Sequence, residues 1–172
     1  MRFIFIFIMF PYFVFADSMY FMPYEAKEAI NAIIKEIKQA KNEVNIAVYS
    51  FTNREISKAI RDTAKKGVRF NIIYDHQGNI DNHMTTIGYL SKLKNIYTCT
   101  LKGKLSNNKK YFGIMHNKLA IIDGKTIVFG SANWSKSAFD INYEMLLISQ
   151  NKDYINQASK YFNKMLNECE KY

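Results

Sequence analysis

Two periodicities alternate along most of this chain, and their alternation limits the folds open to it. Residues 24–42 carry apolar side chains at helical spacing, whereas residues 43–51 and 68–75 are short apolar runs typical of buried strands, with a second helical pattern at 54–66. Similar patterns predict further strands and a closing helix, at 95–102, on either side of Asp123-Gly124, at 143–149 and at 152–171. This order predicts an α/β fold, a layered sheet with helices on both faces.

The N-terminus is a separate segment. Residues 3–15 are almost entirely apolar, contain Pro11 and are too few to span a bilayer as a helix. Polar sequence begins directly after the small residue Ala16, which is typical of a secretory signal peptide comprising residues 1–16. An uncleaved hydrophobic anchor is the alternative. Both interpretations predict that residues 17–172, which contain no linker or repeat, form one exported domain.

The chain is strongly basic. Its 172 residues include 24 Lys and Arg against 15 Asp and Glu, a formal net charge of +9. Only Arg2 is charged within residues 1–16, so +8 remains on residues 17–172. Such a surface attracts polyanions, which makes nucleic acid and anionic lipid the candidate substrates. The apolar and charged fractions, 48% and 23%, are those of a globular domain and exclude a disordered or collagen-like chain.

The most informative stretch is residues 115–144, MHNKLAIIDGKTIVFGSANWSKSAFDINYE. His116 and Lys118 are two apart in a predicted strand, so their side chains share one face of it. The run from Leu119 to Ile122 is apolar and belongs in the core. A histidine and a lysine therefore stand side by side at the start of a buried strand.

The turn after this strand decides which residues face that pair. If Asp123-Gly124 is a two-residue hairpin turn, His116 lies opposite Ser131. A turn moved on by one residue places Lys118 opposite Ser131 and His116 opposite Asn133. Both registers gather the same four polar side chains on one face, an arrangement that predicts a phosphate pocket.

The spacing of these residues resembles the HKD motif of the phospholipase D superfamily. The sequence reads His116-x-Lys118-x4-Asp123 and continues, after six residues, with Gly130-Ser131-x-Asn133. Gly130 has no side chain and leaves room for a ligand oxygen near the backbone. One motif copy in a short basic chain resembles the Nuc-type bacterial endonucleases, which assemble one active site from two copies across a homodimer. The resemblance extends over residues 20–172.

The resemblance implies a role for each motif residue. His116 would attack phosphorus and form a phosphohistidine, and His116 of the partner subunit would protonate the leaving oxygen. Lys118 and Asn133 would donate hydrogen bonds to the phosphate oxygens, and Ser131 would help to hold the phosphate. Glu144 matches the acidic residue that hydrogen-bonds the nucleophilic histidine in this family. The other motif positions are predicted to be structural: Asp123 and Gly130.

The resemblance also implies chemistry without a metal ion or cofactor, because lysine and imidazolium supply the positive charge that Mg²⁺ provides elsewhere. Two further histidines, His76 and His83, lie close in sequence to Asp75 and Asp81. Their spacing is a weak metal signal, and solvated side chains are the simpler interpretation. A serine hydrolase is not indicated, because Ser131 has no GxSxG elbow.

A basic segment, LKGKLSNNKKYFG, precedes the motif. Its lysines could guide a phosphate backbone toward the pocket while nearby aromatic rings stack on bases. A solvated loop beside core aromatics is the alternative, and the position next to the motif favours the nucleic-acid interpretation. The candidate contacts are Lys102, Lys104, Lys109, Lys110, Tyr111, Phe112 and Trp134.

The chain has two cysteines, Cys99 in a predicted strand and Cys169 on the apolar side of the closing helix. Both thiols are expected to face the core. An exported protein with an even number of cysteines favours a disulfide between them, and separate burial as two small apolar side chains is the alternative.

The leading hypothesis is an exported nonspecific endonuclease that cleaves DNA, with RNA as a second polymer, in a bacterial periplasm or outside the cell. It would act as a homodimer and would contact a membrane only if residues 1–16 are retained. A lipid phosphodiesterase of the phospholipase D type is the alternative enzyme. A noncatalytic nucleic-acid-binding module is the alternative from another class, and the intact motif argues against it.

Overall fold

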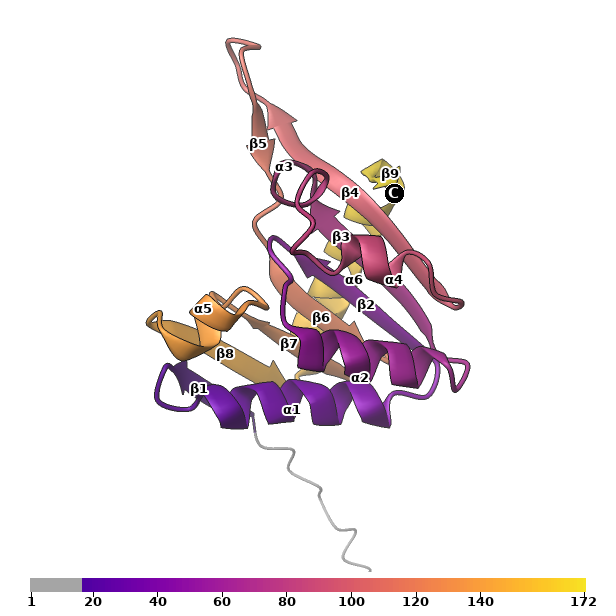
Figure 1. The fold of residues 1–172 in the computed structure, drawn as a ribbon, viewed down its shortest axis with the longest axis vertical. Helices are drawn as coiled ribbons and strands as arrows, with labels where there is room; N and C mark the ends of the chain where they lie inside the picture. Colours follow the sequence, from indigo (N-terminus) through magenta and orange to yellow (C-terminus); the bar gives the residue numbers. More distant parts are fainter. Residues whose placement is uncertain (1–16) are drawn as a thin grey trace, which may run out of the picture.

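The computed structural model describes residues 17–172, which form one open mixed sheet with helices on both faces (Figure 1). The strands are β1 (Ser18–Met22), β2 (Glu43–Val48), β3 (Arg69–Asp75), β4 (Ile96–Leu105), β5 (Phe112–Ile114), β6 (Lys118–Ile122), β7 (Thr126–Gly130), β8 (Glu144–Ser149) and β9 (Glu170–Lys171). Their order across the sheet is β1-β8-β7-β6-β2-β3-β4-β5, and β9 pairs with β4. The neighbours β2, β3 and β4 are parallel, and the other pairs are antiparallel.

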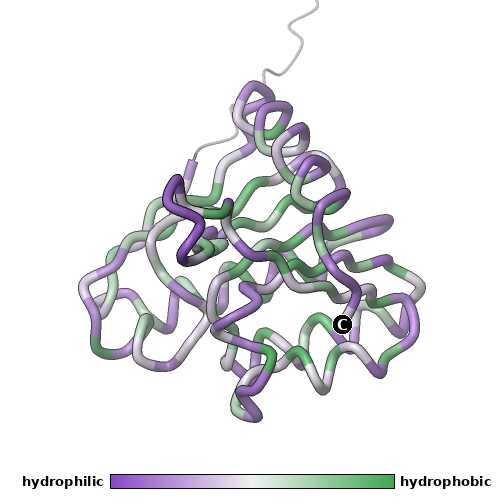
Figure 2. Tube along the Cα trace, turned by 90° about the horizontal axis from the view of Figure 1, so that it is seen from above, coloured by the Kyte–Doolittle hydropathy of each residue, from purple (hydrophilic) through white to green (hydrophobic). Residues whose placement is uncertain are grey.

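The helices cover the two faces unequally. They are α1 (Ala26–Gln39), α2 (Arg54–Ala64), α3 (His76–Asn79), α4 (Ile87–Leu90), α5 (Lys136–Asp140) and α6 (Lys152–Glu168). The larger apolar core lies between the sheet and α1, α2 and α5, and the smaller one lies between the sheet and α6. In Figure 2 the strands inside the molecule are largely green and the outer turns largely purple, as two layers of helix around an apolar sheet require. The predicted α/β fold is confirmed.

Local sequence signals explain where the main helices begin. Asn53 precedes α2, and its side chain accepts hydrogen bonds from the backbone N–H groups of Glu55 and Ile56. Asn151 does the same for Asp153 and Tyr154 at the start of α6. Both asparagines satisfy N–H groups that have no partner inside the helix.

The predicted hairpin registers are wrong by one residue. Ile122 pairs with Thr126, a register midway between the two predicted ones, because the turn contains three residues, Asp123-Gly124-Lys125. Asp123 and Gly124 both adopt positive φ. Continuing this ladder places Gly130, not Ser131, opposite Lys118. The four polar side chains therefore do not face one another across the hairpin.

Edge strands and element ends also differ from the sequence expectations. The short strands β1, β5 and β9 were not predicted, and they lie at sheet edges, where strands are exposed and have weak apolar patterns. The last helix ends at Glu168 rather than at 171, so Cys169 follows it. No helix within residues 17–172 is long and apolar enough to cross a membrane. The predicted signal peptide, residues 1–16, lies outside the described residues and stays a prediction.

A disulfide joins Cys99 in the buried part of β4 to Cys169 just after α6. Seventy residues separate the two cysteines. The bond therefore closes a long loop and connects the end of α6 to the sheet.

Reduction of this disulfide is expected to lower the free energy of unfolding by about 4 kcal/mol, because an unfolded chain closed over so long a loop has less conformational entropy to gain. Urea unfolding of residues 17–172 with and without reductant measures the difference. A Cys99→Ala/Cys169→Ala variant, which has no bond to reduce, is the control and should not respond to reductant. Equal unfolding midpoints of the native protein in both conditions would contradict the expectation.

Candidate active site

His116 lies two residues before β6 and has an exposed side chain. The buried carboxylate of Asp75, at the end of β3, fixes the segment that carries it. One Asp75 oxygen accepts a hydrogen bond from the Met115 N–H at 2.8 Å, and the other accepts one from the Gly78 N–H at 2.8 Å. The Tyr49 ring, directly after β2, meets the His116 ring edge to face with centroids 4.7 Å apart. Groups at the carboxyl ends of β2 and β3 therefore position His116.

Lys118 is the first residue of β6, and its side chain is buried, with 6% exposed. Its Nζ donates a hydrogen bond to the backbone carbonyl oxygen of His116 at 2.9 Å and lies 5.4 Å from the centroid of the Tyr49 ring. Burial lowers the pKa of Lys118, and the negative charge of Glu144 opposes that shift. Tyr49, His116 and Lys118 thus form one packed cluster.

The lowered pKa of Lys118 predicts an alkaline limit to phosphate binding. If its ammonium holds the substrate phosphate, the affinity for a small phosphate diester such as bis(4-nitrophenyl) phosphate should fall as pH rises through a value below the usual lysine pKa of 10.5. Glu144→Gln removes the charge that favours the ammonium, so this variant should lose affinity at a lower pH. Binding is measured from about pH 7 to about pH 11 in a His116→Ala background, with circular dichroism at each pH, because the rate would also depend on a protonated histidine. An affinity that stays constant past pH 10.5 in folded protein would contradict the role of Lys118.

A cavity of about 570 Å³ opens beside this cluster, between β6, β7 and α6. We call it the His116 cavity. His116 and Lys118 line it together with Phe129, Gly130 and Tyr154. It combines an exposed imidazole and a buried ammonium with apolar walls, a combination suited to hold a small anionic group.

Gly130 has a structural reason to be glycine. A Cβ added there would collide with the carbonyl oxygen of Met145 in the neighbouring strand β8. The missing side chain therefore lets β8 pair closely with β7, in line with the predicted structural role. Gly130 is expected from the sequence to leave room for a ligand oxygen, whereas these contacts show that it leaves room for the backbone of β8.

Ser131 and Asn133 follow the end of β7. The Ser131 hydroxyl accepts a hydrogen bond from the Met145 N–H at 3.1 Å, and the Ser131 N–H donates to the Met145 carbonyl at 3.0 Å. Asn133 is half-buried, and within residues 17–172 its Oδ1 has no hydrogen-bond partner. Ser131 therefore ties this segment to β8, and the phosphate-binding roles of both residues stay predictions.

Glu144 is the first residue of β8 and is half-buried. Its negative charge favours the protonated form of Lys118. Its side chain accepts a hydrogen bond from Asn142 at 3.5 Å, and not from His116. The predicted bond between Glu144 and His116 stays a prediction.

Asp123 lies in the hairpin turn, at the other end of β6 from Lys118. Its carboxylate accepts hydrogen bonds from the backbone N–H groups of Lys41, Asn42 and Glu43, at 2.7, 2.8 and 2.9 Å. Burial alone would raise the pKa of Asp123, but these three hydrogen bonds outweigh it and the pKa is lowered. The third motif residue therefore anchors the start of β2 to the turn, which is a structural role.

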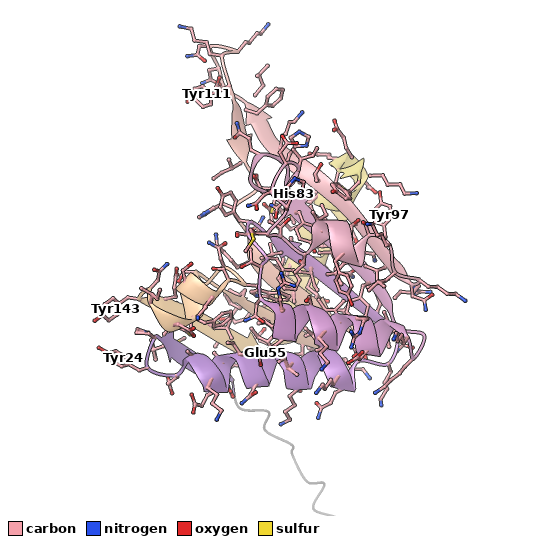
Figure 3. All side chains as sticks on the ribbon, in the orientation of Figure 1. Tyr24, Glu55, His83, Tyr97, Tyr111 and Tyr143 are labelled. Atoms are coloured by element: carbon pink, nitrogen blue, oxygen red, sulfur yellow. A yellow bond between two sulfur atoms is a disulfide. The ribbon has the colours of Figure 1, made fainter. Side chains whose placement is uncertain are left out.

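The basic segment forms the β4–β5 hairpin, which projects beyond the body of the molecule (Figure 1). Tyr111 lies on this projection and is 65% exposed (Figure 3). The four lysines of the hairpin are exposed as well. The Lys102 Nζ lies over the Phe112 ring, 5.6 Å from its centroid. The predicted base-stacking role of Trp134 is wrong, because that ring is 1% exposed and packs edge to face against Phe51 in the core.

The residues of the weak metal pattern, around His76 and His83, do not converge on one point. His76 is hydrogen-bonded to the Thr100 hydroxyl at 3.0 Å, and Asp75 accepts the backbone bonds from Met115 and Gly78. His83 is exposed on the loop before α4 (Figure 3). Nowhere in the described part of the chain do three His, Cys, Asp or Glu side chains gather as a metal site would require.

Sequence reasoning missed two residues of this site. Tyr49 contacts both His116 and Lys118, and Asp75 fixes the segment before His116. Both stand at the carboxyl ends of adjacent parallel strands, the edge where α/β sheets bind ligands. That rule was the one signal that could have found them.

Comparison with known proteins identifies the family. A family model described as cardiolipin synthase, PLD-like domain, matches residues 33–166. The structure of NucT from Helicobacter pylori is similar, with a TM-score of 0.89 and 45% sequence identity, over 91% of this chain and 99% of that one. Nuc from Salmonella typhimurium, a phospholipase D family member, has a TM-score of 0.74 and 26% identity, over 91% of this chain and 97% of that one.

More distant relatives have longer chains. The mitochondrial cardiolipin hydrolase of Mus musculus is 24% identical over 143 residues, which are 83% of this chain and 60% of that protein. This chain therefore spans about three fifths of the length of that curated relative. The family model and the two solved structures confirm the resemblance that the motif predicted. The chain belongs to the phospholipase D superfamily, as a single-HKD member of the Nuc type.

Proposed function

We propose that this protein is an exported endonuclease that hydrolyses DNA through a phosphohistidine intermediate, without a metal ion, at an active site shared by two copies of the chain. The observation that supports it best is the packed cluster of His116, Lys118 and Tyr49 at one cavity, in a chain 45% identical to NucT. An imidazole is a good nucleophile, and a buried ammonium is a strong donor to phosphate oxygens.

The reaction has two steps. A neutral ring nitrogen of His116 attacks phosphorus, the bond from phosphorus to the leaving oxygen breaks, and the protonated His116 of the partner subunit gives that oxygen its proton. Water then attacks the phosphohistidine and gives a proton to that same partner histidine, and the P–N bond breaks. Lys118 donates to the nonbridging oxygens, whose negative charge grows in both transition states. Each histidine ends in its starting protonation state.

This reaction needs a second histidine, which supports a dimer. Among residues 17–172, His116 is the one histidine that lines the His116 cavity. A half-exposed apolar surface continues from this cavity, on the side of the sheet that α6 leaves uncovered. We call it the β1/β8 face. It consists of Phe129, Leu147, Met145, Met19 and Phe21. Paired residues of antiparallel strands lie on one face, so these five side chains are contiguous. A second copy of the chain would cover them and bring its own His116 nearby.

The β4–β5 hairpin supports a polymer substrate. Its four exposed lysines and exposed Tyr111 combine the charge that attracts a phosphate backbone with a ring on which a base can stack. DNA and RNA both offer these features, so RNA is the second polymer to test.

A lipid headgroup is the second candidate substrate. Two comparisons favour it: the matching family model is described as a cardiolipin synthase, and the curated relative is a cardiolipin hydrolase. The same attack of His116 on phosphorus would release a headgroup. The hairpin lysines and the greater identity to NucT favour the nucleic acid.

Export rests on residues 1–16 and on the disulfide. The N-terminal sequence has the composition of a signal peptide, and a disulfide persists in an oxidising compartment such as the bacterial periplasm. Expression of the full chain in bacteria, followed by fractionation and intact-mass analysis, tests this point. Mature protein beginning at Asp17 in the periplasm or medium is the expected result, and full-length protein in the cytoplasm would refute export.

Three substrates compared in EDTA test the proposed activity: single-stranded DNA, duplex DNA and cardiolipin vesicles, each with residues 17–172. Cleavage of DNA in the chelator is the expected result. Release of lipid products alone would replace the nuclease by the lipid enzyme. Binding of DNA with no turnover of any substrate would support the noncatalytic module.

A further inference from the structure

A second cavity, of about 630 Å³, lies on the other side of the sheet from the His116 cavity. Its walls come from α2, from the loop between α3 and α4, from α4 and from the C-terminal Tyr172. We call it the α2 cavity. No step of the proposed reaction uses this cavity.

The α2 cavity has a strongly positive lining. Four side chains supply the charge, Arg54, Lys58, Arg61 and Lys92, and no Asp or Glu is among the described residues that line the cavity. Asp62, just outside, pairs with Arg61 at 2.7 Å. Arg54, Lys58 and Lys92 are exposed to solvent. Such a concentration of cations around a hollow is suited to bind phosphate groups.

An aromatic ring lies among these cations. Tyr89, at the end of α4, is 44% exposed, and its hydroxyl accepts a hydrogen bond from Arg61 at 3.5 Å. A ring held in this way offers a surface for a base beside a group that binds phosphate. The lining thus matches a nucleotide unit better than it matches an isolated inorganic anion.

The α2 cavity is connected to the active site through two short segments. Tyr49, which packs on His116, is three residues before Thr52, which lines the cavity. The Asn79 side chain donates a hydrogen bond to the Tyr49 carbonyl at 2.7 Å, and the next residue, Ile80, also lines the cavity. The first segment follows β2 and the second follows β3, and these two strands are parallel neighbours. Both cavities therefore lie at the edge of the sheet where the carboxyl ends of β2 and β3 meet.

We propose that the α2 cavity binds a nucleotide of the same polynucleotide strand whose phosphodiester bond is cleaved at His116, several nucleotides away. This inference rests on the proposed nuclease function and deepens it, since it makes a polymer the preferred substrate. Phosphates of the strand contact Arg54, Lys58 and Lys92, and a base stacks on Tyr89. The His116 cavity alone recognises the scissile phosphate, and the α2 cavity adds affinity for strands long enough to reach it.

The test compares two charge-reversed variants with equal net charge. Lys58→Glu/Lys92→Glu changes the α2 cavity, and Lys35→Glu/Lys38→Glu changes two exposed lysines on α1. Binding of a fluorescent single-stranded 30-mer is measured by anisotropy at several salt concentrations. Cleavage of the 30-mer is compared with cleavage of bis(4-nitrophenyl) phosphate, a diester too small to reach the α2 cavity.

The cavity variant is expected to bind the 30-mer about tenfold more weakly than the α1 variant, and the slope of log affinity against log salt should decrease by about 1.4, as expected for two lost phosphate contacts to a single strand. Its ratio of 30-mer cleavage to small-diester cleavage should fall by a similar factor. Adenosine monophosphate should compete weakly, because it occupies only one of the two sites.

Equal affinities, slopes and cleavage ratios for the two variants would overturn the proposal. So would tight binding of adenosine monophosphate that depends on Lys58 and Lys92 while binding of the 30-mer does not, because the cavity would then serve a free nucleotide. Failure of the nuclease function has a different signature, since the native protein would then leave the 30-mer intact, whether or not it cleaves the small diester.

Discussion

His116→Ala is expected to lower the rate of DNA cleavage by about 10⁴-fold or more, with the folded structure intact. The loss is large because each shared site would lose both its nucleophile and its proton donor in one substitution, and groups that act as a unit cannot replace one another. The comparison of kcat for the native and variant proteins, with single-stranded DNA in EDTA, measures the effect.

Folding and DNA binding provide the control for this variant. The His116 side chain is exposed and packs only against the Tyr49 ring among the aromatic contacts of the described residues, so its removal leaves the core unchanged. The variant should therefore unfold at the native urea concentration and bind the 30-mer with native affinity. Residual cleavage within tenfold of the native rate would assign the nucleophile to another residue.

Breaking the proposed dimer should be nearly as damaging. Phe21→Lys/Met145→Lys places two lysines in the centre of the β1/β8 face, and in a symmetric dimer four charges would be buried in one apolar contact. We expect a monomer whose cleavage rate is lower by about 10³-fold or more, because a monomer has no second histidine to protonate the leaving oxygen. Sedimentation and cleavage rates at the same protein concentration measure both changes.

Ile141→Lys is the matched control for this prediction. Ile141 is 70% exposed at the end of α5, on the opposite side of the sheet from the β1/β8 face. That variant should remain dimeric and active. A Phe21→Lys/Met145→Lys monomer that cleaves DNA at the native rate would refute the shared site.

The main features of the fold could be predicted because they depend on local patterns. The amphipathic stripe of α1 and the apolar runs of β2 and β3 are visible in the sequence. The edge strand β1 could not be found in this way, since two of its apolar side chains, Met19 and Phe21, are half-exposed and its neighbour β8 is distant in sequence.

The candidate site was predictable only in part. The spacing of His116 and Lys118 gives their shared location, whereas the register of Ser131 depends on the number of residues in the turn, which is three. The Asp123 side chain holds that turn through hydrogen bonds to the distant start of β2, a contact that no local pattern predicts. The burial of Trp134 likewise depends on a distant residue, Phe51. The α2 cavity combines segments far apart in sequence, and no spacing of residues predicts it.

A covalent protein–DNA adduct tests the central claim most directly. Residues 17–172 would be mixed with a single-stranded oligonucleotide, stopped within milliseconds to seconds in alkaline denaturant, which preserves a P–N bond, and analysed by intact and peptide mass spectrometry. We predict a nucleotide adduct on the peptide that contains His116, formed and lost at the rate of turnover and absent from His116→Ala. Efficient DNA cleavage with no adduct at any time, or an adduct on another residue, would contradict the phosphohistidine mechanism.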